Sequence, residues 1–244
     1  MARKQSASSK SFGGILAVVA IAGVAAIGYV VSRPAKVTTL ETTLPPVEAS
    51  GIRMGDSMAL VQIVEFADFE CPGCGQFATV TEPDIRARLI ETGEVGFVFM
   101  DLPLDGHRNS PAAHNAARCA DEQGKFWPMH DGIFLRQHEW NSQSTRTPKK
   151  VLAEIARSVG LDMKQWDDCF DSERMLPQIA ANRAEATRLR IRGTPSFIIN
   201  GRLIETSGVP TYDQMRVLIT EAKVRALAER SEASQAAGAA KKTP

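Results

Sequence analysis

Residues 66–77 read FADFECPGCGQF, and the two cysteines in this stretch, Cys71 and Cys74, admit two chemistries. A Cys-x-x-Cys pair is typical of a redox dithiol when it lies beside a strand–helix pattern, and of a zinc knuckle when a second ligand pair follows. The remaining cysteines, Cys119 and Cys169, are singletons within helical patterns. The sequence therefore favours a dithiol over a zinc module, and we expect no metal.

The residues around the dithiol predict the order strand, dithiol, helix, strand. The β-branched and aromatic run 59–68 indicates a buried strand, and 94–103 indicates a second one. The apolar spacing after the cysteines indicates a helix that ends near Gly93, and Pro83 is expected to kink or break it. The first N–H groups of a helix have no internal partner and stabilise a thiolate, so the first cysteine should be the exposed nucleophile and the second the shielded one.

The rest of the chain predicts helices, then a hairpin and a closing helix. Helical patterns extend to about residue 122 and over 126–136, and three more follow. Asn200-Gly201 between apolar runs predicts a two-residue β-turn, and an amphipathic segment after residue 211 predicts a helix that covers the sheet. Several conspicuous side chains are expected to pack or face solvent rather than bind a metal or substrate: His107, His114, His130, Trp127, Trp166, Arg188, Arg190 and Arg192.

The N-terminal end predicts a membrane anchor. Residues 12–32 carry no charge and are long enough to cross a hydrocarbon core of roughly 30 Å, after a basic segment 1–11 that is expected to be cytoplasmic. A cleaved signal peptide is the alternative, although its apolar region usually spans only about 7–15 residues. We expect a linker over 33–56 and a disordered tail over 229–244. A net charge of +1 gives no electrostatic footprint for nucleic acid.

Whether residues 12–32 are an anchor or a cleaved signal peptide, the domain that follows is expected to be exported. An anchored chain would hold it on the extracytoplasmic side of the cytoplasmic membrane, in a periplasm or at the cell surface. Disulfides persist in such compartments. The two leftover cysteines are therefore expected to form a structural bond, Cys119–Cys169, with two buried free thiols as the alternative.

Three stretches together make the chain resemble the DsbA-like family of exported thiol–disulfide oxidoreductases. They are FECPGC at 69–74, CADEQGKFW at 119–127 and GTPSFIINGR at 193–202, and the likeness in order and spacing covers residues 57–228. The resemblance implies an α/β architecture: a thioredoxin-like fold with an inserted helical subdomain over about 107–190. In this chain one N-terminal transmembrane helix is expected to precede it.

The resemblance implies roles for three positions outside the dithiol. Pro195 matches the family's cis-proline, which packs beside the dithiol and exposes the backbone before it to a substrate strand. Thr194 matches a position whose side chain tunes the choice of substrate and partner. Glu65 matches a buried acid that accepts the proton of Cys74 as this thiol attacks the mixed disulfide. The alternative is that the Glu65 side chain reaches solvent at the end of a strand.

The chain departs from the family's strongest oxidants at Gly73, where those enzymes carry a thiolate-stabilising histidine. Without this donor the chain is expected to oxidise more weakly, because stabilisation of the reduced form is what makes a dithiol oxidising. The direction stays open between oxidase and isomerase or reductase, and a binding or chaperone module without turnover is a further alternative. The family implies substrates with protein cysteines and a membrane redox partner, either a quinone-linked oxidase or a reductant, and no cofactor.

Overall fold

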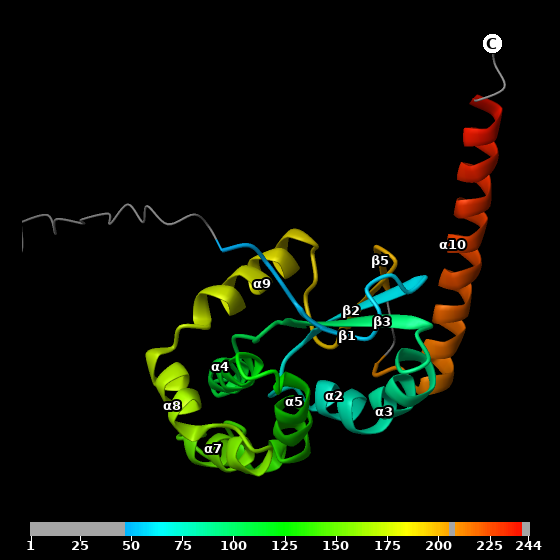
Figure 1. The fold of residues 1–244 in the computed structure, drawn as a ribbon. Coiled ribbons are helices and arrows are strands. Elements are labelled where there is room, and N and C mark those ends of the chain that lie inside the picture. Colours follow the sequence, from blue (N-terminus) through cyan, green and yellow to red (C-terminus); the bar gives the residue numbers. More distant parts are fainter. Residues whose placement is uncertain (1–46, 205–207, 241–244) are drawn as a thin grey trace, which may run out of the picture. The chain divides into compact units, whose positions relative to one another are not determined.

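A five-stranded mixed sheet forms the centre of the computed structural model, which describes residues 47–204 and 208–240 (Figure 1). The strands are β1 (Ile52–Met54), β2 (Val61–Ala67), β3 (Val95–Asp101), β4 (Ser196–Ile199) and β5 (Arg202–Ile204). Their spatial order is β1-β3-β2-β4-β5, in which β2 and β3 are parallel and every other neighbouring pair is antiparallel. This order places β2, the strand that leads into the dithiol, in the middle of the sheet.

The central strands and the hairpin agree with the sequence predictions. Strands β2 and β3 fall within 59–68 and 94–103, and the side chains of Val61, Ile63 and Phe97 are fully buried. Strands β4 and β5 are joined at Asn200 and Gly201, whose φ angles of 46° and 78° are both left-handed. Two such residues form the tight turn that matches the right-handed twist of the flanking strands.

The helical run after the dithiol has four consecutive segments: α2 (Pro72–Gln76), the π-helical η1 (Phe77–Thr81), α3 (Glu82–Ile85) and the π-helical η2 (Arg86–Ile90). Of the expected kink or break at Pro83, the break is wrong, because the run continues past this residue with a change from π-helical to α-helical register next to it. The Glu82 N–H bonds to the Phe77 carbonyl in the wider π-helical register. Pro83 thereby falls in the first turn of α3, where its missing N–H leaves no bond unmade.

The helical insertion runs between β3 and β4, and its core continues into the sheet through Phe99 of β3 and Phe69 beside the dithiol. Cys119 and Cys169 are bonded, with their Cα atoms 5.7 Å apart. Trp166 is fully buried, as the packing role predicts, and its indole N–H donates to the Ala116 carbonyl. The helices are α4 (Ser110–Asp121), α5 (Phe126–Leu135), α6 (Gln137–Trp140), α7 (Lys149–Ser158), α8 (Met163–Ser172) and α9 (Leu176–Arg188).

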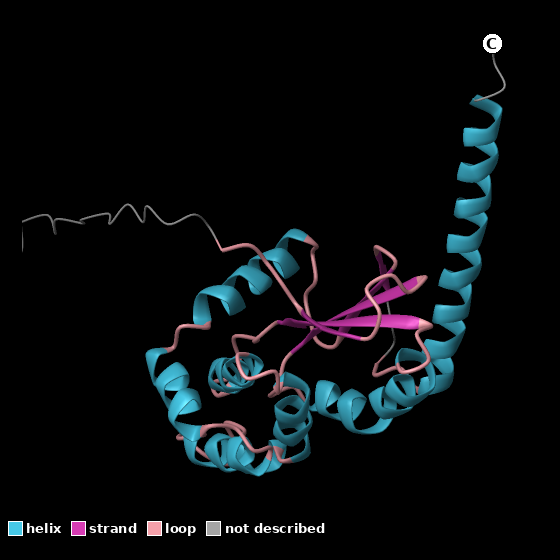
Figure 2. Cartoon of the chain, viewed as in Figure 1, coloured by secondary structure: helices cyan, strands magenta, loops and turns pink. Residues whose placement is uncertain are grey.

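Helices cover both faces of the sheet. The run α2 to η2 and the closing helix α10 (Tyr212–Ala240) bury one face, through Phe77, Ile85 and Met215 among others. Helix α9 lies on the opposite side, where Ala186 joins a smaller apolar cluster with Phe66 of β2 (Figures 1 and 2). The face under α2 and α5 is therefore the interior against which the dithiol is built.

Two predicted boundaries need correction. Residues 52–54 belong to the sheet rather than to a linker, because Ile52 pairs with Phe99 of β3 and Ser50 exchanges hydrogen bonds with Asn182 of α9. Helix α10 continues to Ala240, through most of the segment expected to be a disordered tail, as the Ala-rich composition favours helix even without packing.

The predicted anchor, 12–32, lies outside the described residues, as do segment 1–11 and the linker up to residue 46. Within the described ranges, none of the helices combines the length and the apolar character needed to span a membrane.

Candidate active site

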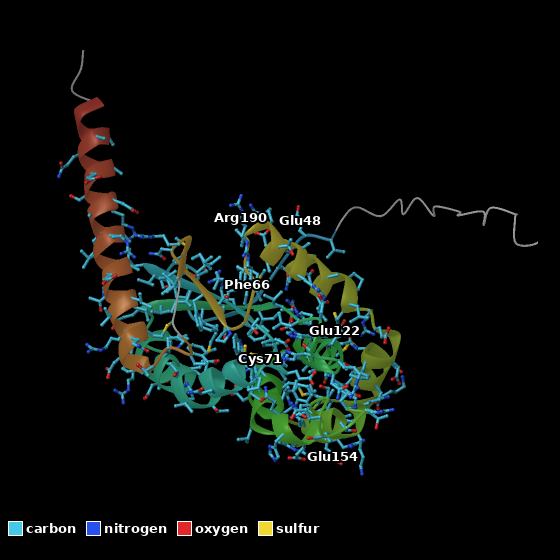
Figure 3. The ribbon with its side chains drawn as sticks, turned by 180° about the vertical axis from the view of Figure 1, so that it is seen from behind. Glu48, Phe66, Cys71, Glu122, Glu154 and Arg190 are labelled. Atoms are coloured by element: carbon cyan, nitrogen blue, oxygen red, sulfur yellow. A yellow bond between two sulfur atoms is a disulfide. The ribbon has the colours of Figure 1, made fainter. Side chains whose placement is uncertain are left out.

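The dithiol lies where β2 ends and α2 begins, beside the helical insertion (Figure 3). Cys71 is the N-cap residue of α2, with an extended backbone, and its carbonyl accepts the Gly75 N–H. Gln137 of α6 holds this turn from the other side, because its side-chain amide donates to the carbonyls of Phe69 (2.7 Å) and Cys71 (2.9 Å). The turn is thus fixed by both the strand–helix junction and the insertion.

The two sulfurs have opposite environments. Cys71 is half-buried, and its pKa is lowered to about 5, chiefly by a hydrogen bond from the Cys74 thiol. The Thr194 side chain and the backbone N–H groups of Cys74 and Gly73 contribute further. Cys74 is fully buried, and burial, its bond to Cys71 and the charge of Glu65 raise its pKa. At neutral pH Cys71 is therefore a thiolate and Cys74 a thiol.

Thr194 contacts the Cys71 sulfur through more than one group. As a thiol, Cys71 donates to the Thr194 carbonyl across 3.4 Å. The Thr194 hydroxyl is buried and has no hydrogen-bond partner among the described residues in that state. A thiolate can only accept, so ionisation of Cys71 turns this hydroxyl into the available donor.

Pro195 and Gly73 border the same sulfur. The Thr194–Pro195 peptide bond is cis, as the resemblance implies. A Cβ atom added at Gly73 would lie 3.3 Å from Val209, 3.4 Å from Pro195 and 3.7 Å from the Cys71 sulfur. The absence of a side chain at Gly73 thus leaves room for Val209 and Pro195. The position of Val209 beside the dithiol was not predicted from the sequence.

Glu65 lies inside the sheet beneath the dithiol, not in solvent. It is only 2% exposed, and its backbone is in register with Phe99 of β3 and Phe197 of β4. Burial raises its pKa, and the negative charges of Glu82 and Cys71 raise it further. A carboxyl with a raised pKa next to the Cys74 thiol is suited to exchange a proton with it.

Sequence reasoning missed an acidic residue three positions before the dithiol. Asp68 is fully buried, and its carboxylate accepts hydrogen bonds from the Ser110 hydroxyl and from the Leu104 N–H. It also bonds His107 Nδ1 at 2.6 Å. Partial burial opposes the charge on His107, but the bond to Asp68 prevails and raises the pKa of this histidine.

The histidines and the tryptophan singled out from the sequence lie partly where they were expected and partly elsewhere. His107 was expected only to pack or face solvent, yet it lies in the loop before α4, next to the dithiol. His114 and His130 are buried on α4 and α5, in agreement with a core role. The indole N–H of Trp127 donates to the Arg53 carbonyl, which is a packing role.

Comparison with known proteins decides the family. The profile of the family described as Thioredoxin matches residues 48–221. The chain belongs to the thioredoxin family. The match includes β1, so it starts earlier than the expected domain boundary at residue 57.

Curated relatives of this thioredoxin-family chain are of two kinds. The Na(+)/H(+) antiporter NhaA 3 of Salinispora tropica is 36% identical over 149 residues, which are 61% of this chain and 21% of the antiporter. The chain thus spans about a fifth of that relative's length. The probable disulfide bond formation protein D of Bacillus cereus is 26% identical over 68% of this chain and 76% of its own.

Solved structures confirm the DsbA-like arrangement of the fold. BdbD from Bacillus subtilis superposes with a TM-score of 0.62 at 22% identity, over 74% of this chain and 99% of its own. The Wolbachia pipientis protein α-DsbA1 gives 0.64 at 22% identity, over 73% and 94%. The thioredoxin-like sheet with inserted helices is therefore shared with these proteins.

Proposed function

We propose that this chain is a thiol–disulfide oxidoreductase that oxidises cysteine pairs of other proteins through Cys71 and Cys74. The observation that carries this proposal is the difference between the two sulfurs. One is half-buried with a pKa of about 5, and the other is fully buried with a raised pKa. A non-catalytic binding module has no need of this difference, whereas thiol exchange requires an accessible thiolate and a shielded partner.

The reaction uses the oxidised Cys71–Cys74 pair. A substrate thiolate attacks the Cys71 sulfur, the bond between the two cysteines breaks, and Cys74 leaves and takes a proton from Glu65. A second substrate thiolate then attacks the substrate sulfur of the mixed disulfide and releases Cys71 as a thiolate. Two electrons have moved from the substrate to the dithiol, and a low pKa makes Cys71 a good leaving group.

The direction follows from the stabilised thiolate. Stabilising Cys71 as a thiolate stabilises the reduced protein and makes the dithiol oxidising. The Cys74 thiol, Thr194 and two backbone N–H groups supply this stabilisation although residue 73 is glycine. The name of the Bacillus cereus relative, probable disulfide bond formation protein D, supports the same direction. Isomerase or reductase activity is the alternative outcome of the test.

Oxidation of a reduced, unfolded protein with cysteines tests the proposal. The purified oxidised chain should remove two thiols from the substrate for each Cys71–Cys74 pair that becomes reduced. A Cys71→Ser variant should remove none, whereas a double Cys119→Ala, Cys169→Ala variant should act like the parent. Reduction of substrate disulfides by the reduced chain, without oxidation in the other direction, would identify a reductase.

We also propose that residues 12–32 anchor the chain in the cytoplasmic membrane, with 1–11 in the cytoplasm and the dithiol outside. The Cys119–Cys169 disulfide supports an oxidising compartment. A membrane redox partner, a quinone-linked oxidase in the oxidase direction, would reset the dithiol. The membrane-bound protein should resist extraction by high salt and keep its terminal peptide, whereas a mature N-terminus between residues 26 and 50 would indicate a cleaved signal.

A further inference from the structure

A second group of buried polar side chains lies on the same face of the sheet as Glu65. Glu82 of α3 and His130 of α5 are both fully buried, and the His130 ring packs 5.3 Å from the ring of Phe99. Phe99 is in register with Glu65 on the neighbouring strand. The charge of Glu82 also reaches Glu65, because it raises the pKa of that carboxyl. The group therefore adjoins the acid beneath the dithiol.

Two atoms of this group face each other without partners. Glu82 Oε2 and His130 Nε2 are 3.8 Å apart, and neither has a hydrogen-bond partner among the described residues. The other ring nitrogen, Nδ1, bonds Asp131 at 2.9 Å and so carries a proton that the carboxylate accepts. Without a proton between them, Oε2 and Nε2 would be two buried acceptors that face each other. One proton on either atom, passed directly or through one water, gives the pair a donor and an acceptor.

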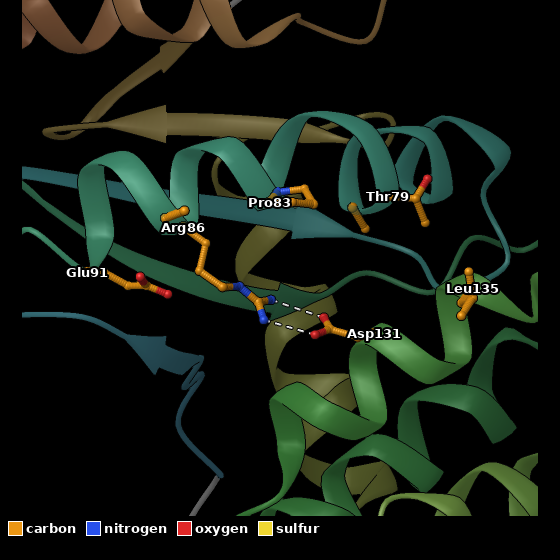
Figure 4. A pocket seen from close by; sticks show the side chains of 8 residues that line it. Thr79, Pro83, Arg86, Glu91, Asp131 and Leu135 are labelled. Carbon is orange, nitrogen blue, oxygen red and sulfur yellow. Dashed lines mark hydrogen bonds and ion pairs between the residues drawn. The ribbon is translucent and has the colours of Figure 1, made fainter.

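The far end of the group reaches solvent. Asp131 is about half exposed, and it lines a pocket between the helical run α2 to η2 and α5 (Figure 4). Arg86 makes two bonds to Asp131, at 2.9 and 3.0 Å, and one to Glu82 Oε1 at 2.7 Å. A guanidinium that already neutralises both carboxylates disfavours a metal cation here, although Glu82, His130 and Asp131 lie close enough together to hold one.

We propose that Glu82, His130 and Asp131 form a proton path that connects Glu65, beneath the dithiol, with solvent in the pocket beside α5. The inference rests on the proposed function of the dithiol and adds positioning residues to it. Its advantage is geometric: a substrate bound over Cys71 covers the near face, and protons reach or leave Glu65 from the other side.

The step that re-forms the disulfide shows what the path carries. Cys74 forms a bond to the Cys71 sulfur, the bond between Cys71 and a bound thiol breaks, and that thiol leaves as a thiolate. The Cys74 proton passes to Glu65 and then to Glu82. His130 accepts it at Nε2 and releases its Nδ1 proton to Asp131, from which water takes it. No electrons move beyond those of the disulfide exchange.

An aromatic disulfide that releases a coloured thiolate separates the two steps without a protein substrate. Attack by reduced Cys71 releases the first coloured thiolate, and attack by Cys74 releases the second. Glu82→Gln and His130→Gln should leave the first phase unchanged and slow the second about tenfold, since only the second phase needs a proton to leave Cys74. Glu82→Gln also removes a charge that raises the pKa of Glu65, so His130→Gln is the cleaner of the two variants.

His114→Gln is the matched control. His114 is a second fully buried histidine bonded to an aspartate, Asp101 at 2.7 Å, and its Nε2 is also unpartnered within the described ranges. It packs 4.8 Å from Phe69, as His130 packs 5.6 Å from the same ring. Both phases of His114→Gln should match the parent. A second phase as fast in Glu82→Gln and His130→Gln as in the parent would overturn the path.

Imidazole ¹⁵N spectra of the unaltered protein give a reading that needs no variant to fold. Chemical reduction of the dithiol should shift the His130 Nε2 resonance and leave that of His114 in place. An unchanged His130 resonance would contradict the path. Neither measurement depends on oxidation of a substrate protein, so failure of the proposed function and failure of the path remain distinguishable.

Discussion

The two cysteine pairs of this chain differ in every property that governs sulfur chemistry. Cys71 and Cys74 are three residues apart in a turn at the start of a helical run, and one of them is partly accessible. Cys119 and Cys169 are 50 residues apart, each about 1% exposed, and join α4 to α8. Proximity in sequence and access to solvent make one pair exchangeable, whereas burial between two helices makes the other a cross-link.

The largest expected effect is the difference in reactivity within the first pair. After reduction of the dithiol, iodoacetamide should modify Cys71 at least about 100-fold faster than Cys74, because only the first is an exposed thiolate. The rate should be half-maximal near pH 5, the pKa of Cys71, and fall as the pH drops below it. Peptide mapping gives both rates, and equal labelling would remove the contrast.

The second effect is on stability. Replacing Cys119 and Cys169 by alanine should lower the free energy of unfolding by roughly 3–4 kcal/mol, since the bond closes a loop of 50 residues. Thermal melting measures the loss, and oxidation of a substrate protein should continue at the parent rate below the melting temperature. If exchange is lost while the protein remains folded, the bond is not merely a cross-link.

The third effect concerns residue 73. Gly73→His should raise the reduction potential by about 30–60 mV if the ring donates to the Cys71 thiolate, because such a bond is worth about 1.5–3 kcal/mol. The structure adds a cost, since a Cβ here meets Val209 and Pro195 at 3.3 and 3.4 Å. Gly73→Ala introduces this contact without a donor and is the control. A rise of equal size in both variants would show that contact, not donation, changes the potential.

The smallest effect is expected at Thr194. Thr194→Val keeps the shape but removes the hydroxyl that is available to a Cys71 thiolate, so the pKa of Cys71 should rise and the reduction potential fall by about 30 mV. Thiolate absorbance followed against pH reports the pKa, and equilibration with glutathione reports the potential. No change in either would assign the stabilisation to Cys74 and the backbone alone.

The features that sequence patterns predict well are local. The β-branched run before the dithiol, the Asn200-Gly201 turn and the helical insertion each rest on neighbouring residues, and all are found. The burial of Glu65 was implied by the family resemblance, whereas the strand pattern alone left a solvent-exposed side chain open; the structure buries it.

Features that depend on distant contacts escaped prediction. Strand β1 has only three residues and exists because β3 pairs with it. Glu82 looks like a surface residue of a helix, but the packing of α5 against the helical run after the dithiol buries it beside His130. Likewise, His107 lies next to the dithiol because Asp68 binds it across 39 residues of sequence.

The reduction potential of Cys71–Cys74 tests the central claim most directly. We expect equilibration with glutathione at neutral pH, with Cys119–Cys169 intact, to give about −180 mV, between the values of roughly −270 mV for reducing thioredoxins and −120 mV for strong oxidants. Because the folded pKa of Cys71 lies below that of an unfolded cysteine, the stabilisation of the reduced form should be complete above the unfolded value and vanish as the pH falls through about 5. A potential near −270 mV would contradict the account. So would a plot of potential against pH whose slope does not change near pH 5.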